Sequence, residues 1–126
     1  MRVHVASKTL RLIPALALAV CQYGCVSLLD CSTRDVATQY SPSRGFAART
    51  YVVDCGATAA AAIHVAIYRT DVSQEQSRDV FIYEGDISDV EAIWTSRSEL
   101  LIKYRIGKVF KNENFVDGVT IKYLHP

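Results

Sequence analysis

Residue types and motifs on which much enzyme chemistry depends are scarce in this sequence. It has three histidines in 126 residues, and beyond residue 24 these are His64 and His125. It carries no zinc-ligand spacing, no glycine-rich phosphate loop and no Gly-x-Ser-x-Gly elbow. We therefore expect no catalytic residues, no metal and no cofactor, which leaves the cysteines and the strand-like patterns as the informative features.

Long apolar runs are missing as well. The run over residues 12–20 is nine residues long, fewer than the roughly 20 that span a bilayer and within the roughly 7–15 of a secretion signal. Three basic residues and no acidic one precede it, and it stops at Cys21. These features predict a bacterial export signal over residues 1–24. The alternative is an uncleaved anchor that extends to Leu29.

Two cysteines near the end of this signal are candidates for lipid attachment. Cys25 follows a small glycine, as lipoprotein processing favours, whereas Cys21 follows a bulky valine. Cleavage after Ala19 without any lipid is the third alternative. We expect membrane anchoring through a lipid on Cys25. Because Val26 is not the aspartate linked with inner-membrane retention, we expect the protein on the periplasmic side of the outer membrane.

An excess of charge of one sign is absent from the rest of the chain. Without the first 24 residues, eleven basic residues stand against thirteen acidic ones, and no basic patch remains. Binding to nucleic acid depends on clustered lysines and arginines, so we expect no nucleic-acid partner. The remaining roughly 100 residues suit one domain. We divide them into a linker over residues 25–40 and a β domain over residues 41–126.

Two further cysteines, Cys31 and Cys55, lie beyond the signal and its cleavage site. Unpaired thiols are uncommon in an oxidising compartment, so we expect these two to form a disulfide. A bridge that closes a loop of about 24 residues would stabilise the fold by roughly 3 kcal/mol in the chain-entropy model. It would also tie the beginning of the mature chain to the domain.

The hydrophobic pattern has a period of two rather than 3.6 residues, which is typical of half-buried strands. Leu100, Ile102 and Tyr104 share one face, for example, while Lys103 points away. The pattern predicts an all-β fold, either a single small antiparallel sheet or a sandwich, built as a meander of about five to seven strands. Residues 57–66, with their run of alanines, could instead form a short helix. The predicted strands span residues 46–54, 62–68, 79–84, 91–95, 100–106 and 119–123.

The order of several short motifs resembles a family of small uncharacterised bacterial lipoproteins and exported proteins. These motifs are Ser41-Pro42 before a strand, Asp-Cys-Gly-Ala-Thr at residues 54–58 and a leucine-rich strand after Trp94. The resemblance covers roughly residues 41–123 and implies no assigned activity. The start of the β domain is also similar to a blade of TolB-like β-propellers. It departs from that pattern where the blade has aspartate, and one blade's length of chain cannot close a propeller ring.

Two groups of residues carry side chains of the kinds that catalyse reactions or bind metal ions. His64 could serve as the base for a nucleophilic Cys55, but a disulfide at that cysteine would abolish the pair. On the strand pattern His64 lies opposite the apolar stripe, so we expect a surface histidine. An acidic group around Gly85 could bind calcium or act as paired carboxylates, but its spacing fits no EF-hand loop and a solvated turn is the better interpretation. The acidic group is Glu84, Asp86, Asp89 and Glu91.

The expected function is that of a non-enzymatic envelope protein whose sheet face or edge binds another protein. The partner is either a structural protein or a toxin, for which the domain would serve as an inhibitor or immunity protein. The candidate binding residues are aromatic, and a core position is an equally good interpretation for each: Tyr51, Tyr68, Tyr83 and Trp94. The alternative is a small periplasmic hydrolase or ligand-binding domain that uses His64 and nearby carboxylates.

Overall fold

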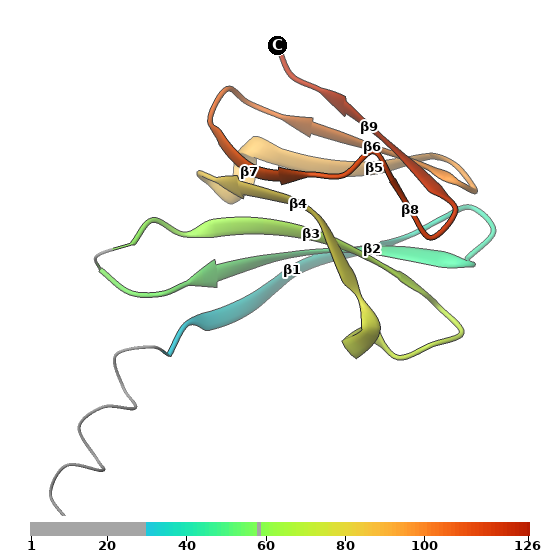
Figure 1. The fold of residues 1–126 in the computed structure, drawn as a ribbon, viewed down its shortest axis with the longest axis horizontal. Helices are drawn as coiled ribbons and strands as arrows, with labels where there is room; N and C mark the ends of the chain where they lie inside the picture. Colours follow the sequence, from blue (N-terminus) through green and yellow to red (C-terminus); the bar gives the residue numbers. More distant parts are fainter. Residues whose placement is uncertain (1–29, 58) are drawn as a thin grey trace, which may run out of the picture. The chain divides into compact units, whose positions relative to one another are not determined.

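The computed structural model describes residues 30–57 and 59–126, which form two β-sheets (Figure 1). The predicted signal over residues 1–24, with the lipidation candidates Cys21 and Cys25, lies outside the described residues. The first sheet has the strand order β1-β2-β3-β4-β7 and is antiparallel throughout. Its strands are β1 (Ser32–Tyr40), β2 (Phe46–Asp54), β3 (Ala62–Arg69), β4 (Arg78–Glu84) and β7 (Lys108–Asn112).

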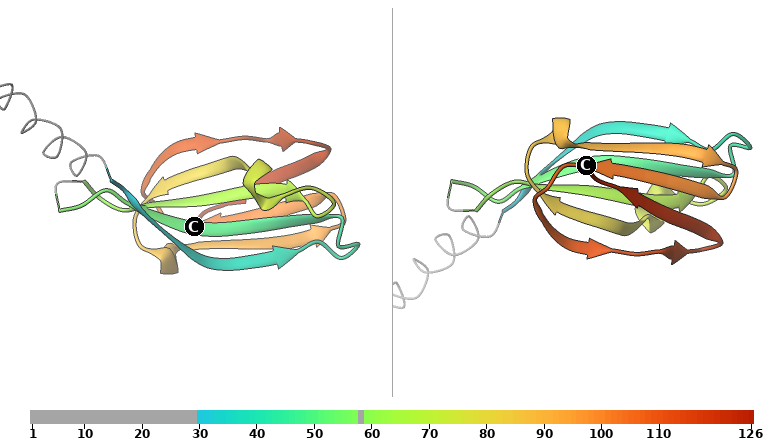
Figure 2. Two further views of the ribbon diagram at one scale, coloured as in Figure 1. Left: turned by 90° about the horizontal axis from the view of Figure 1, so that it is seen from below. Right: turned by 90° about the horizontal axis from the view of Figure 1, so that it is seen from above.

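The second sheet has four strands in the order β5-β6-β9-β8 and packs against one face of the first sheet (Figure 2). Two short 3₁₀ turns precede β4 and β5: η1 (Gln74–Gln76) and η2 (Ile87–Asp89). The strands of the second sheet are β5 (Val90–Ser96), β6 (Glu99–Tyr104), β9 (Val119–Leu124) and β8 (Phe115–Val116).

The predicted all-β fold is confirmed in its sandwich form, and each predicted strand has a counterpart. β3 begins at Ala62 and not in a helix, because its β-branched residues recur at every second position and all face the core. β1 occupies much of the segment expected to be a linker; its polar side chains gave no apolar stripe to detect. β6 pairs in parallel with β9, so the order departs from a simple meander.

The hydrophobic core lies between the two sheets. Phe81 of β4 is fully buried, and its ring centroid lies 5.1 Å from that of Tyr104 and 5.6 Å from that of Tyr123, both in the second sheet. Along one side of the sandwich, the indole Nε1 of Trp94 in β5 donates to the carbonyl of Gln39 in β1 at 2.9 Å. Aromatic contacts and edge hydrogen bonds therefore join the sheets.

The predicted disulfide between Cys31 and Cys55 is confirmed. It joins the residue before β1 to the residue after β2, at the end of the β1-β2 hairpin opposite its turn. Both cysteines are exposed. The bond therefore clamps the edge strand β1 to the sheet at the point where the described domain begins.

Candidate functional site

The outer face of the five-stranded sheet carries connected polar and aromatic side chains, and no described strand lies over this face (Figure 1). Strand register brings them together: Tyr51 of β2 is opposite His64 of β3, and Arg49 is opposite Ala66. From the other side, Asp79 of β4 is also opposite Ala66. We refer to the connected set as the outer-face network: Asp35, Arg49, Tyr51, His64 and Asp79.

The carboxylate of Asp79 joins three strands within this network. One oxygen accepts a hydrogen bond from the Tyr51 hydroxyl at 2.6 Å, and the other lies 3.1 Å from His64 Nδ1. The Tyr51 and His64 rings stack with centroids 4.8 Å apart. Ala66, which lies opposite Arg49 on one side and Asp79 on the other, is fully buried and small, which leaves room for the longer side chains to meet. His64 lies on the outer face, opposite the apolar stripe as the pattern predicted, but its neighbours leave only 15% of the side chain exposed.

Arg49 extends the network to the edge strand. Its guanidinium carbon lies 4.4 Å from the Tyr51 ring centroid, a cation–π distance. Its Nε donates to Asp35 Oδ1 of β1 at 2.6 Å. The network therefore runs without interruption from β1 across β2 and β3 to β4.

The surroundings of Tyr51 keep its hydroxyl protonated. Burial, and then the hydrogen bond to Asp79, raises the pKa of Tyr51 above its ordinary value. A hydroxyl with a raised pKa stays protonated at neutral pH and is a weak nucleophile. The Asp79–His64 pair resembles the acid and the histidine of a hydrolase triad, in which the acid orients the histidine. The one nucleophile that the sequence suggested for it, Cys55, is held in the disulfide.

Two more tyrosines and an arginine extend the polar surface toward the β1-β2 turn. Ala47 of β2 is opposite both Tyr40 of β1 and Tyr68 of β3, so these tyrosines flank a small buried residue. Tyr40 is half exposed, and the Arg44 guanidinium carbon lies 5.3 Å from its ring centroid. Burial, and then the neighbouring Tyr40 hydroxyl, raises the pKa of Tyr68. We define the tyrosine–arginine face as Tyr40, Arg44, Arg49, Tyr51 and Tyr68.

The four aromatic residues predicted to bind a partner lie in different environments. Tyr51 and Tyr68 belong to the tyrosine–arginine face. Tyr83 is only 2% exposed and points into the core beside Phe81, so of its two interpretations the core position is confirmed. The turns at Gly85 and Gly107 enclose its ring, and alternation along β4 places it on the same face as Phe81. Trp94 is half-buried, and its indole donates a hydrogen bond to the Gln39 carbonyl of β1, so it joins the sheets.

The acidic group around Gly85 has local structural roles. Asp86 and Asp89 form a capping box on η2, and hydrogen bonds from Ser88 lower the pKa of Asp86. Asp89 also lies 3.5 Å from Arg105 as an ion pair. Within residues 30–57 and 59–126, no group of three or more histidine, cysteine, aspartate or glutamate side chains is placed to hold a metal ion.

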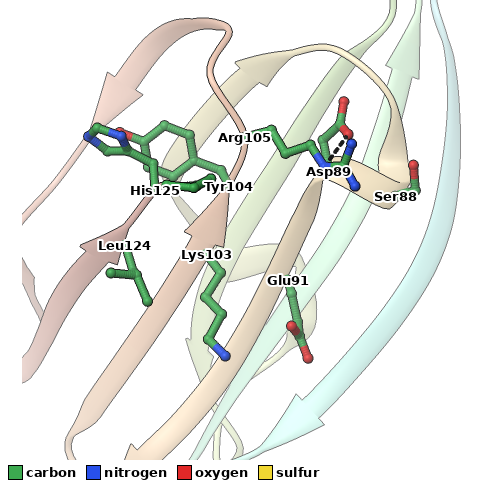
Figure 3. Close-up of a pocket in the computed structure, with 9 residues that line it drawn as sticks. Ser88, Asp89, Glu91, Lys103, Tyr104, Arg105, Leu124 and His125 are labelled. Atoms are coloured by element: carbon green, nitrogen blue, oxygen red, sulfur yellow. Dashed lines mark ion pairs between the residues drawn. The ribbon is translucent and has the colours of Figure 1, made fainter.

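An open cleft of about 350 Å³ lies on the outer side of the four-stranded sheet (Figure 3). Register places Glu91, Lys103 and Leu124 side by side in it, and the Asp89–Arg105 ion pair lies at one end. Two acidic and two basic side chains balance each other, so the cleft favours neither an anion nor a cation. Its lining is completed by Ser88, Tyr104, His125 and Pro126.

Comparison of the chain with models of protein families, with curated proteins and with solved structures finds no match. The resemblances to exported lipoproteins and to TolB-like blades therefore stay predictions. Among the described residues, no helix is long and apolar enough to cross a membrane.

Sequence reasoning missed Arg49 and Asp79, the residues that connect the outer-face network. The alternation in β2 contains a signal for Arg49, because it shares a face with Tyr51 and faces away from buried Ala48 and Val52. No comparable signal exists for Asp79. Its position relative to Tyr51 depends on which strands are neighbours and on the register shift between β3 and β4.

Proposed function

We propose that this chain is a non-enzymatic protein-binding domain of the bacterial envelope, and that the tyrosine–arginine face binds the partner protein. The observation that carries the proposal is the grouping of three tyrosines and two arginines on a side of the sheet that no described strand covers. Tyrosine and arginine are enriched among the residues that dominate binding energies at protein interfaces. The partner is a structural envelope protein or a toxin that the domain inhibits.

The hydrogen bonds beneath this face support the proposal. Arg49 and Tyr51 are held in place by Asp35 and Asp79 before any partner arrives. Immobilising a flexible side chain on binding costs about 0.5–1.5 kcal/mol, and a side chain that is already fixed avoids much of this cost. The network therefore suits a preformed binding surface better than a reactive site.

The exposed disulfide supports export to an oxidising compartment, where such bonds persist. Within that proposal, Cys25 carries the lipid that anchors the protein to the outer membrane. Labelling cells with a palmitate analogue should mark the wild-type protein and leave the Cys25→Ala variant unmarked. Equal labelling of the two would exclude Cys25 as the site and direct attention to Cys21.

Binding can be tested by capture from the detergent-solubilised envelope of the bacterium that encodes the protein. The immobilised wild-type protein should retain one partner at a stoichiometric level. The variants Tyr40→Ala and Tyr68→Ala should each weaken retention by about tenfold, the effect of losing a residue that contributes about 1.4 kcal/mol.

Phe115→Ala is the matched control for these variants. Phe115 is 65% exposed and lies on β8 of the other sheet, so its removal deletes an exposed aromatic ring away from the tyrosine–arginine face. Equal weakening by all three variants would contradict the proposed surface. A hydrolytic activity that is lost in His64→Ala, with no captured protein, would favour the hydrolase alternative.

A further inference from the structure

We propose that the Cys31–Cys55 disulfide is a redox lock on the tyrosine–arginine face: its reduction releases the first half of β1 and thereby loosens the outer-face network. The significance of the lock for binding rests on the proposed function, whereas the release of β1 does not.

The disulfide is open to reagents in the folded protein. Cys31 and Cys55 are both exposed, so a dithiol can attack either sulfur without prior unfolding. Exposed disulfides are more readily reduced than the buried structural ones of secreted proteins. Accessibility therefore separates this bond from a purely structural cross-link.

β1 has little else to hold it in place. All nine of its residues are exposed, and the core cluster contains none of its side chains. Ordering each residue costs conformational entropy, which β1 does not offset by apolar burial. Its attachment depends on backbone pairing with β2, on a few side-chain contacts and on the cross-link.

A β-bulge divides β1 into two halves with different attachments. The register runs from Ser32 to Asp35, shifts at Val36 and resumes at Ala37. The second half is fixed by the hydrogen bond from Trp94 to Gln39, and the turn that follows is closed by a bond from the Ser41 amide to the Phe46 carbonyl at 2.9 Å. The first half is attached by the disulfide at its start, by a long hydrogen bond from the Ser32 hydroxyl to the Asp54 carbonyl at 3.4 Å and by the exposed Asp35 carboxylate paired with Arg49. Reduction of the disulfide should therefore free residues 32–35 and leave residues 37–40 in place.

The first half of β1 contains the residue that connects this strand to the network. Asp35 accepts the hydrogen bond from Arg49, and Arg49 lies over the Tyr51 ring. When Asp35 moves away, the Arg49 guanidinium loses the partner that fixes it there. The loss of order at Arg49 then affects Tyr51. Tyr51 in turn donates a hydrogen bond to Asp79 and stacks on His64, and these two residues contact each other.

The redox step is an ordinary thiol–disulfide exchange. A dithiol reductant attacks one sulfur, forms a mixed disulfide and then closes on itself. Two electrons and two protons pass to Cys31 and Cys55, which become thiols, and the reductant becomes a disulfide. In the test the reductant is dithiothreitol.

Hydrogen–deuterium exchange of the purified protein, before and after dithiothreitol, measures the release directly. After reduction, the amides of residues 32–35 should gain at least about tenfold more in exchange rate than those of residues 37–40 and of β3, which sense only the loss of global stability. The ring NMR signals of Tyr51 and His64 should shift at the same time. Unchanged exchange at residues 32–35 would overturn the proposal. Equal acceleration at residues 32–35 and across β3 would also overturn it, because the disulfide would then act only through global stability.

Variants separate the two steps of the proposal. The double variant Cys31→Ser with Cys55→Ser should match the reduced protein and ignore dithiothreitol. Asp35→Asn in the oxidised protein should shift the Tyr51 and His64 signals without equal acceleration at residues 32–35. Asp71→Asn, which weakens an exposed ion pair with Arg69, should shift neither signal. If the lock is found but Tyr40→Ala leaves partner capture unchanged, the proposed function fails and the lock stands.

Discussion

Asp79 is the hydrogen-bond acceptor that joins Tyr51 and His64, so we expect its loss to destabilise the outer face. Its carboxylate accepts hydrogen bonds from two partly buried groups, Tyr51 and His64. Asp79→Ala leaves both donors without their acceptor and should lower the free energy of unfolding by about 1–3 kcal/mol. Urea denaturation measures this. Asp71→Ala, at the exposed ion pair with Arg69, should cost less than about 1 kcal/mol, and an equal loss for the two variants would contradict the role of Asp79.

Buried tyrosines should also give the protein a characteristic alkaline instability. Burial raises the pKa of Tyr51, Tyr83 and Tyr123 above the ordinary value. Above about pH 10 the unfolded chain loses these protons while the folded chain keeps them. The contribution of the raised pKa values is therefore fully present below about pH 10 and declines as the pH rises further.

Urea denaturation between about pH 8 and pH 11 tests the alkaline instability, because this range brackets the ordinary tyrosine pKa. The free energy of unfolding should fall with rising pH at the top of the range, and less steeply in Tyr51→Phe, which has one titrating group fewer. Identical slopes for the two proteins would show that Tyr51 titrates normally in the fold.

Among the elements, the strands with alternating apolar residues could be predicted, including the edge strand β5, whereas the edge strands β1, β7 and β8 could not. β3, β6 and β9 place alternate apolar residues in the core, so their own sequences identify them. β1 has no buried residue and exists because β2 presents an edge to it. β8 has two residues, too few to show a periodic pattern.

The candidate site could be predicted only in part. Tyr51, Tyr68 and His64 stand out in the sequence, whereas the contact of Asp79 with them depends on the order of the strands.

The turns after β4 and β6 form a slot for the Tyr83 ring. A Cβ atom added at Gly107 would lie 2.5 Å from the Tyr83 hydroxyl oxygen, and one at Gly85 would lie 2.3 Å from a ring carbon. Tyr83 is almost fully buried and cannot move aside. Gly107→Ala should therefore destabilise the fold by about 1–3 kcal/mol, the usual effect of overpacking.

Thermal or urea denaturation of Gly107→Ala can be compared with Gly45→Ala as the control. At Gly45 the nearest atom to an added Cβ, the Ser43 hydroxyl oxygen, is 3.5 Å away, which is an ordinary contact. The control should change stability by less than about 0.5 kcal/mol. Equal effects at the two glycines would mean that the Tyr83 ring can shift after all.

At the scale of the whole molecule, neither sheet has a core of its own. The buried side chains of β3 and β4 pack against those of β6 and β9, and Phe81 contacts tyrosines of the opposite sheet. The Trp94–Gln39 hydrogen bond joins the edges of the two sheets. The redox lock acts outside this shared core, which is why its release is expected to be local.

A shared core predicts that the two sheets unfold together. Trp94, the single tryptophan, reports on the second sheet by fluorescence, and far-UV circular dichroism reports on both. Their urea transitions should coincide in the wild-type protein, as for a two-state domain. Phe81→Ala removes a fully buried ring between the sheets and should cost about 3–5 kcal/mol, with both transitions shifted equally. Phe115→Ala, at an exposed ring, should change stability by about 0.5 kcal/mol or less. Separate transitions would mean that one sheet is stable alone, and the local character of the redox lock would then need a different physical basis.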